Sequence, residues 1–184
     1  GEGRCTAGGA CALPPPGAPV EAFRFDLPSG RYPQQILVAA TGDTYFTHVP
    51  QTSVASSTLV LVSLDRFGHP RFEVDLTAET PGLQSSRSLM LDAVNHRLFL
   101  SLGVWLQARD SRTGALLWSR DLRTLNIPVT NSDTGALHLS VQAIALVGVD
   151  DVLAQITEGA SLHQQHLVTF DGASGVERGR IWRP

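Results

Sequence analysis

The 184-residue sequence predicts an all-β fold made of repeated units, each a four-stranded antiparallel sheet. A short ending motif, an aromatic residue followed by two variable residues and Asp-Leu, recurs at intervals of 49 and 46 residues. Between its copies, short apolar runs alternate with polar turns, and no long window has the 3.6-residue periodicity of a helix. Strand-rich repeats of this length are typical of the blades of a β-propeller.

The ending motif marks the last strand of each unit. Its copies are Phe23–Leu27, Phe72–Leu76 and Trp118–Leu122. Upstream of the second and third copies the sequence gives a strand, then Asp and Gly, then another strand. The two Asp and Gly pairs are Asp65 with Gly68, and Asp110 with Gly114. A further unit repeats the turn at Asp171 and Gly175, but Gly179 stands where the aromatic residue is expected.

Each unit also contains an earlier hairpin, two apolar runs separated by a polar turn. The paired runs are Ile36–Ala40 with Tyr45–Val49, Leu89–Leu91 with Leu98–Leu102, and Ala143–Val147 with Val152–Ile156. Each unit is therefore expected to contain four strands. The sequence therefore predicts about three blades plus an orphan strand at Phe23–Leu27, which make an incomplete ring. In an alternative assignment, the orphan strand replaces a poor last strand in the third blade, and three blades pack without a true ring.

The second complete unit has a recognisable turn. Ala108, Asp110, Thr113, Gly114 and Trp118 match the pattern Ala-x-Asp-x-x-Thr-Gly-x-x-x-Trp at every defined position. This segment resembles the blade-ending motif of the pyrroloquinoline-quinone-type (PQQ-like) β-propeller repeat family. The resemblance extends over about residues 23–182, with 22–184 expected to form the blades.

The neighbouring units depart from that pattern in different ways. Asp65, Gly68 and Phe72 keep the ring but shorten the turn by one residue, whereas Asp171 and Gly175 keep the turn and lose the ring.

These residues are predicted to dock one blade on the next. Asp and Thr side chains bond their own turn backbone, Gly supplies a positive φ, and the aromatic ring packs between blades. The predicted docking residues are Asp65, Gly68, Phe72, Ala108, Asp110, Thr113, Gly114, Trp118, Asp171 and Gly175. In enzymes of the family that this segment resembles, the quinone lies at the centre of a full ring, and many members of the superfamily bind none. We therefore expect no cofactor, no catalytic residue and no enzyme.

Composition narrows the possible partners. A net charge of −3 and a pI near 6.0 provide no basic field for nucleic acid or an anionic membrane. All 14 basic residues are arginine, so Schiff-base and phosphate-loop lysine chemistry is excluded. No apolar run reaches the roughly 18 residues of a membrane helix.

Residues 1–21 are predicted to be a Gly/Pro-rich linker that forms neither a ladder nor a helix. Cys5 and Cys11, the two cysteines of the chain, could form a disulfide, remain unpaired or pair elsewhere. A spacer with cysteines in front of a propeller favours an extracytoplasmic location, in the periplasm, on the outer membrane surface or secreted.

Metal sites are weakly indicated. His138, His163 and His166 do not form a complete zinc pattern, and the oxygen-rich segments 131–135 and 150–151 do not complete a calcium loop. We expect no metal.

Three blades cannot close a ring, and proteins rarely leave long sheet edges bare. We therefore expect a protein partner or a further chain to complete the propeller. The favoured function is a non-catalytic interaction or assembly module of an exported or surface-tethered bacterial protein. The alternative is a segment of a quinone-dependent or other propeller enzyme whose catalytic residues lie on blades not present here.

Overall fold

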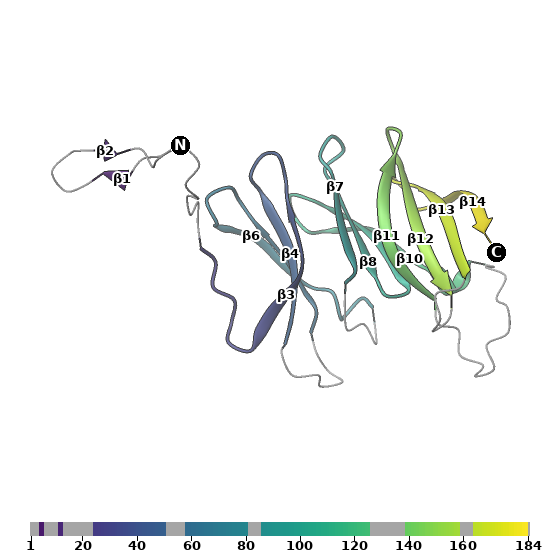
Figure 1. Ribbon diagram of the computed structural model, residues 1–184, viewed down its shortest axis with the longest axis horizontal. Coiled ribbons are helices and arrows are strands. Elements are labelled where there is room, and N and C mark those ends of the chain that lie inside the picture. The colour runs from purple at the N-terminus through teal and green to yellow at the C-terminus, as the bar shows by residue number, and fades with distance from the viewer. Residues whose placement is uncertain are drawn as a thin grey trace.

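The computed structural model describes residues 4–5, 11–12, 24–50, 58–80, 86–125, 139–158 and 164–183. Three four-stranded antiparallel sheets stand side by side, the second between the first and the third (Figure 1). We call them blade 1 (31–75), blade 2 (88–121) and blade 3 (139–183). Among the described residues there is no helix long and apolar enough to cross a membrane.

Within each blade the strands follow one another in chain order, so every neighbour is joined by a hairpin or short connection. The strands of blade 1 are β3 (Arg31–Val38), β4 (Thr44–Pro50), β5 (Val60–Leu64) and β6 (Pro70–Asp75). Those of blade 2 are β7 (Ser88–Asp92), β8 (Arg97–Leu102), β9 (Trp105–Asp110) and β10 (Leu116–Asp121). Those of blade 3 are β11 (Leu139–Val147), β12 (Asp151–Glu158), β13 (Gln164–Asp171) and β14 (Glu177–Arg183). One 3₁₀ turn, η1 (Leu122–Thr124), follows blade 2.

The third and fourth strands of all three blades share one irregularity, a register shift close to the connecting turn. On one side of the shift, Phe72 pairs with Ser63, Trp118 with Ala108 and Gly179 with Thr169. The predicted alignment of the ending motifs therefore matches the ladder, and Gly179 occupies the position of the two aromatic residues.

The predicted fold class is confirmed: the described chain is nearly all β, with three four-stranded blades and an additional segment before blade 1. The alternative in which the orphan strand replaces the last strand of blade 3 is wrong, because β14 pairs with β13 from Gln165 to Phe170. Residues 24–27, the described part of the predicted orphan strand, pack on blade 1 through Phe25 and Leu27. They belong to none of the sheets that the described residues form.

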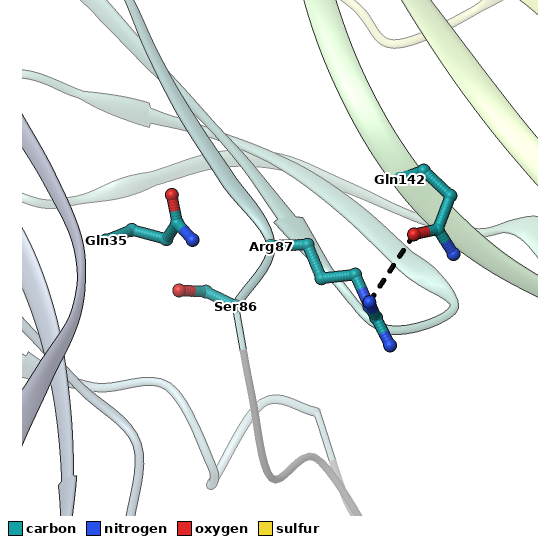
Figure 2. A pocket seen from close by; sticks show the side chains of 4 residues that line it. All are labelled: Gln35, Ser86, Arg87 and Gln142. Carbon is teal, nitrogen blue, oxygen red and sulfur yellow. Dashed lines mark hydrogen bonds between the residues drawn. The ribbon is translucent and has the colours of Figure 1, made fainter.

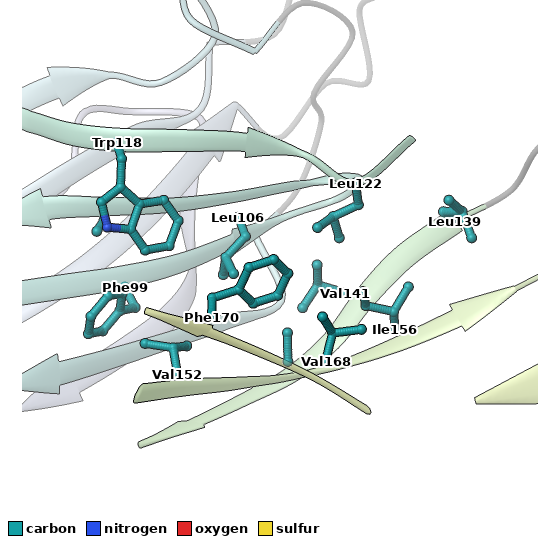
Figure 3. Packing of buried hydrophobic residues seen from close by; sticks show 12 residues of the cluster. Phe99, Leu106, Trp118, Leu122, Leu139, Val141, Val152, Ile156, Val168 and Phe170 are labelled. Atoms are coloured by element: carbon teal, nitrogen blue, oxygen red, sulfur yellow. The ribbon is translucent and has the colours of Figure 1, made fainter. Parts of the chain in front are cut away.

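The largest core lies between blades 2 and 3. Alternate side chains of β12 and β13 face blade 2, because successive residues of a strand point to opposite sides of the sheet. Phe99 and Trp118 lie at one end of this core, Phe170 lies beside Leu106, and the other residues are aliphatic (Figure 3). The rings of Phe99 and Trp118 are 6.0 Å apart and inclined at 45°. A second core, between blades 1 and 2, contains Tyr45 and a group of leucines.

The N-terminal segment contains one feature that its Gly/Pro content did not predict. Strands β1 (Arg4–Cys5) and β2 (Cys11–Ala12) pair with each other, and the backbone of Cys5 lies opposite that of Cys11. The expectation that this region forms no ladder is therefore wrong for these four residues, which precede the proline run. The disulfide itself stays a prediction.

The packing of Trp118 generates a stability prediction. Trp118→Ala should lower the free energy of unfolding by about 3 to 5 kcal/mol, because it removes a large buried ring from the core. Leu117→Ala is the matched control, since Leu117 is the next residue of the same strand and is half exposed. Chemical denaturation of both variants measures the difference. A loss below about 1 kcal/mol for Trp118→Ala contradicts the assignment.

Candidate functional site

The turn between β9 and β10 is organised by one carboxylate. Asp110 Oδ1 accepts hydrogen bonds from the amides of Arg112 and Thr113 at 2.9 and 2.8 Å and from the Thr113 hydroxyl at 3.0 Å. The Gly114 amide donates to the Asp110 carbonyl oxygen, and Gly114 has a φ of +76°. Partial burial raises the pKa of Asp110, but hydrogen bonds from Thr113 and Arg112 outweigh it and leave that pKa below its usual value.

The corresponding turn of blade 3 is built in the same way. Asp171 Oδ1 accepts from the Ser174 amide at 2.7 Å and from the Ser174 hydroxyl at 2.8 Å. Together with Arg178, which forms an ion pair with Asp171, these bonds lower the pKa of Asp171 to about 2. Gly175 has a φ of +66°.

The shorter turn of blade 1 keeps the carboxylate and the glycine. The amides of Phe67 and His69 donate to Asp65 Oδ1 at 2.8 and 2.9 Å, and Gly68 has a φ of +86°. The His69 amide is the main cause of a pKa of Asp65 below its usual value. All three predicted turns are thus formed as local hydrogen-bonded units.

In blades 1 and 2, the aromatic residue of the ending motif lies against the turn of the next blade and not against the turn of its own blade. A Cβ placed on Gly114 of blade 2 would lie 2.7 Å from Cδ2 of Phe72 in blade 1. A Cβ placed on Gly175 of blade 3 would lie 2.7 Å from ring carbons of Trp118 in blade 2. The Trp118 indole Nε1 also donates to the carbonyl oxygen of Gly172 at 2.9 Å. We call this ring-on-glycine arrangement the docking contact.

A buried arginine reinforces the junction between blades 1 and 2. Arg109 is 1% exposed, donates from Nη1 to the Gly114 carbonyl oxygen at 2.9 Å and pairs with Glu79, which follows β6. Burial lowers the pKa of Arg109, and the Glu79 carboxylate acts in the opposite direction. The sequence analysis missed this pair, since Arg109 occupies a variable position of the motif.

A second group of polar residues, also missed from the sequence, lies on the first strands of blades 1 and 3 and just before the first strand of blade 2. Gln35, Ser86, Arg87 and Gln142 line an open hollow of about 350 Å³ (Figure 2). We call these four residues the inner-strand cluster, because β3 and β11 both lie against β7. Arg87 Nη1 donates to Gln142 Oε1 at 3.4 Å.

Two strand irregularities shape the surroundings of this hollow. The ladder of β3 with β4 shifts register between Pro33 and Gln35, and that of β11 with β12 shifts between Val141 and Ala143. The extra residue is a glutamine in both blades, Gln34 in blade 1 and Gln142 in blade 3. Gln34 Oε1 accepts from the Ser86 amide at 2.9 Å. Such bulges redirect side chains and occur often beside functional sites. Glutamines next to apolar strand residues were the available sequence signal.

A buried histidine lies one strand further out. His48 Nδ1 is 3.1 Å from Arg31 Nη1, and Arg31 Nη2 donates to Thr58 Oγ1 at 2.9 Å. Burial is the main cause that lowers the pKa of His48, and the Arg31 charge acts in the same direction. His48 is therefore held neutral as part of a packed polar contact.

The inner-strand cluster supplies amides, a hydroxyl and one guanidinium. Such groups bind carboxylates and other polar anions, but none of the four is a general base near neutral pH. No group of three or more His, Cys, Asp or Glu side chains suited to a metal ion occurs among the described residues. His138, His163 and the segment 131–135 lie outside them.

Comparison with known proteins places the fold. No protein-family model matches the sequence, and a search of curated proteins gives no match. A europium-containing methanol dehydrogenase matches with a TM-score of 0.54 and 16% identity, over 80% of this chain and 24% of that one. The quinohemoprotein alcohol dehydrogenase from Comamonas testosteroni matches with a TM-score of 0.51 and 16% identity, over 77% of this chain and 20% of that one. The chain spans about a quarter or less of their length.

At 16% identity, these likenesses concern the fold alone. They also correct one expectation. The expectation of no enzyme is contradicted, because both matched structures are dehydrogenases. The inference failed because the docking motif reports how blades pack and contains no information about catalysis elsewhere on a ring.

The docking contact predicts a difference between two glycine variants of blade 3. Gly175→Ala and Gly148→Ala both place a side chain at nearly the same φ, +66° and +65°. That conformation costs each variant about 1 to 2 kcal/mol. A Cβ at Gly148 meets nothing within 4 Å, whereas one at Gly175 meets Trp118. Gly175→Ala should therefore lose about 1 to 3 kcal/mol more in denaturant titrations; equal losses contradict the contact.

The Asp171 turn predicts an acid-dependent loss of stability. The pKa of Asp171 is lowered to about 2 in the folded chain, so its contribution is complete above the unfolded value near 3.9. It disappears as the pH falls through about 2. Asp171→Asn should therefore make the thermal midpoint less sensitive to pH between about 4 and about 2. Asp26→Asn, outside the three turns, is the control, and identical pH profiles for the two variants contradict the assignment.

Proposed function

We propose that this chain is a three-blade segment of a larger β-propeller and that its role is assembly, through docking contacts that join it to further blades. The observation that carries the proposal is the repetition of the docking contact at both described junctions, Phe72 on Gly114 and Trp118 on Gly175. Because the contact recurs at both junctions, further blades can be joined through the same contact. The turn aspartates hold each glycine in place, and the rings supply the apolar area.

The two outer blades support the need for completion. Blade 1 has no preceding blade and blade 3 no following blade among the described residues. Ile36 and Val38 of blade 1 and Ile181 of blade 3 are large apolar side chains that remain more than half exposed. Sheets with open edges and faces are prone to uncontrolled association, and propellers avoid it by closing the ring. The partner is therefore a further chain or a further part of the same protein.

The proposed location is extracytoplasmic, in an exported or surface-tethered bacterial protein. The opposed backbones of Cys5 and Cys11 support it, because two cysteines at paired backbone positions suit the oxidising compartments in which disulfides persist. The net charge of −3 gives no reason to propose a nucleic-acid partner.

A second candidate is favoured by the inner-strand cluster. In this alternative the chain is part of a quinone-dependent or other propeller enzyme, as both matched dehydrogenases are enzymes with propeller blades similar to these. The guanidinium of Arg87 and the amides of Gln35 and Gln142 fit the carboxylates of a pyrroloquinoline quinone. Such a cofactor would supply the redox chemistry, while these residues would bind and orient it. Acid and base groups would come from other blades.

One experiment on the protein isolated from its natural source tests both candidates. Denaturing mass spectrometry and light scattering give the chain mass and the assembled mass, and an absorbance spectrum of the same sample detects a redox cofactor. We expect either a polypeptide longer than 19.7 kDa or a complex with more blades. A stable 19.7 kDa monomer contradicts the assembly proposal. A quinone spectrum that Arg87→Ala removes and Arg112→Ala, in the β9–β10 turn, preserves would favour the enzyme.

A further inference from the structure

The docking contact has a direction along the chain. The last strand of blade 1 supplies Phe72 to the turn of blade 2, and the last strand of blade 2 supplies Trp118 to the turn of blade 3. The turn of a blade is therefore contacted by the last strand of the blade before it. Blade 1 has its own turn at Asp65 and Gly68, so it is built to receive such a strand.

The face of blade 1 that would receive it is apolar and half covered. Phe46, Val60, Val62 and Leu64 are buried there, with Phe25 and Leu27 packed over them. The rings of Phe25 and Phe46 are 5.6 Å apart in an edge-to-face arrangement. On the same sheet, Ile36 and Val38 of β3 remain 63% and 64% exposed. Phe25 and Leu27 thus cover the buried residues of this face, and Ile36 and Val38 of the first strand remain uncovered.

The covering segment has the sequence of a last strand. Residues 23–27 repeat the ending motif of β6 and β10, with an aromatic residue first and Asp-Leu last. In those two blades the amide of the motif's final leucine bonds to the residue just before the third strand. The Leu76 amide donates to the Leu59 carbonyl oxygen, and the Leu122 amide donates to that of Val104. Residues 24–28, in contrast, belong to none of the sheets formed by the described residues.

Blade 3, at the other end of the three blades, is different. At the position of Phe72 and Trp118, blade 3 has Gly179. On the outward face of blade 3, the side chain of Gln155 donates to that of Gln165 at 3.1 Å, and Ile181 remains 60% exposed. Blade 3 thus lacks the ring of a docking contact. The end at blade 1 is therefore the one equipped for a docking contact.

We propose that residues 23–27 are the fourth strand of a preceding blade, whose first three strands come from another part of the same polypeptide outside these 184 residues. This inference rests on the proposed function and adds the side, the strand and the kind of sheet that docks. The occupant is a three-stranded antiparallel sheet with an open edge for residues 23–27 and an apolar face for Ile36 and Val38. A second copy of this chain does not fit, because each of its three described blades already has four strands. The same polypeptide is the source we assign, since the matched blades make up 24% and 20% of single longer chains in the two dehydrogenases.

A splice within this chain tests the strand assignment. Residues 86–114, which contain the first three strands of blade 2 and its turn, replace residues 1–19, so that Gly114 precedes Val20. Phe23 then stands four residues after the turn glycine, as Trp118 does in blade 2. We expect the amides of residues 24–27 to exchange with deuterium at least about tenfold more slowly than in the unmodified chain.

The matched control is the same splice without Val20. A one-residue shift turns every side chain of a strand to the other face, so this chain should show no added protection. Equal exchange in the two splices overturns the inference. An independent measurement uses the unmodified chain: Ile36→Ser with Val38→Ser should reduce the fluorescence of a dye that binds apolar surface, while Val94→Ser with Val149→Ser should leave it unchanged. The control valines are 83% and 82% exposed and lie in turns. An unchanged signal for the β3 pair also overturns it.

The natural protein distinguishes this inference from the proposed function. If it is a larger propeller in which the amides of residues 24–27 exchange as fast as in the 184-residue chain, the proposed function stands and the strand assignment fails. If its polypeptide has a mass of 19.7 kDa and a separate protein supplies the blade, the assigned source is wrong.

Discussion

The contact between an aromatic ring and the turn glycine of the next blade is the constraint on which the rest of this structure depends. Each blade is a twisted sheet that cannot bury both of its faces alone, so its stability comes from its neighbours. The contact fixes the lateral position of one sheet on the next, because a ring can lie against backbone only where no Cβ intervenes. Both described junctions meet this requirement, at Gly114 and at Gly175.

The turn aspartates serve that contact indirectly. Asp110 and Asp171 each collect hydrogen bonds from two amides and one hydroxyl, which fixes the loop around a glycine at positive φ. A loop held in this way presents a flat surface of constant shape. Arg109 adds a second restraint in blade 2 by bonding the Gly114 carbonyl oxygen from below while it pairs with Glu79.

The fold could be predicted from the sequence because its determinants are local and repeated. Asp110, Thr113 and Gly114 specify their own turn, and the interval to Trp118 follows from the hairpin. The inner-strand cluster could not be predicted in this way, since Gln35, Arg87 and Gln142 come from three blades and meet only after the sheets have packed. The buried Arg109 was also missed, because its partner Glu79 lies in a connection without a motif. Catalytic status had no local determinant at all, and the inference drawn from its absence was wrong.

The direction of the docking contact has a consequence for how such a chain can diversify by gene duplication. The two halves of one contact are encoded far apart, Phe72 with Gly114 and Trp118 with Gly175, so the unit of inheritance is the junction rather than the blade. A recombination breakpoint in the connection after the Asp-Leu motif separates a ring from its glycine, because Phe72 and Gly114 then come from different parents. A breakpoint between the turn glycine and the ring of one blade, as between Gly114 and Trp118, leaves both halves of each junction together. Blade number can therefore change between descendants without new packing chemistry, provided that crossovers fall between a turn glycine and the ring that follows it.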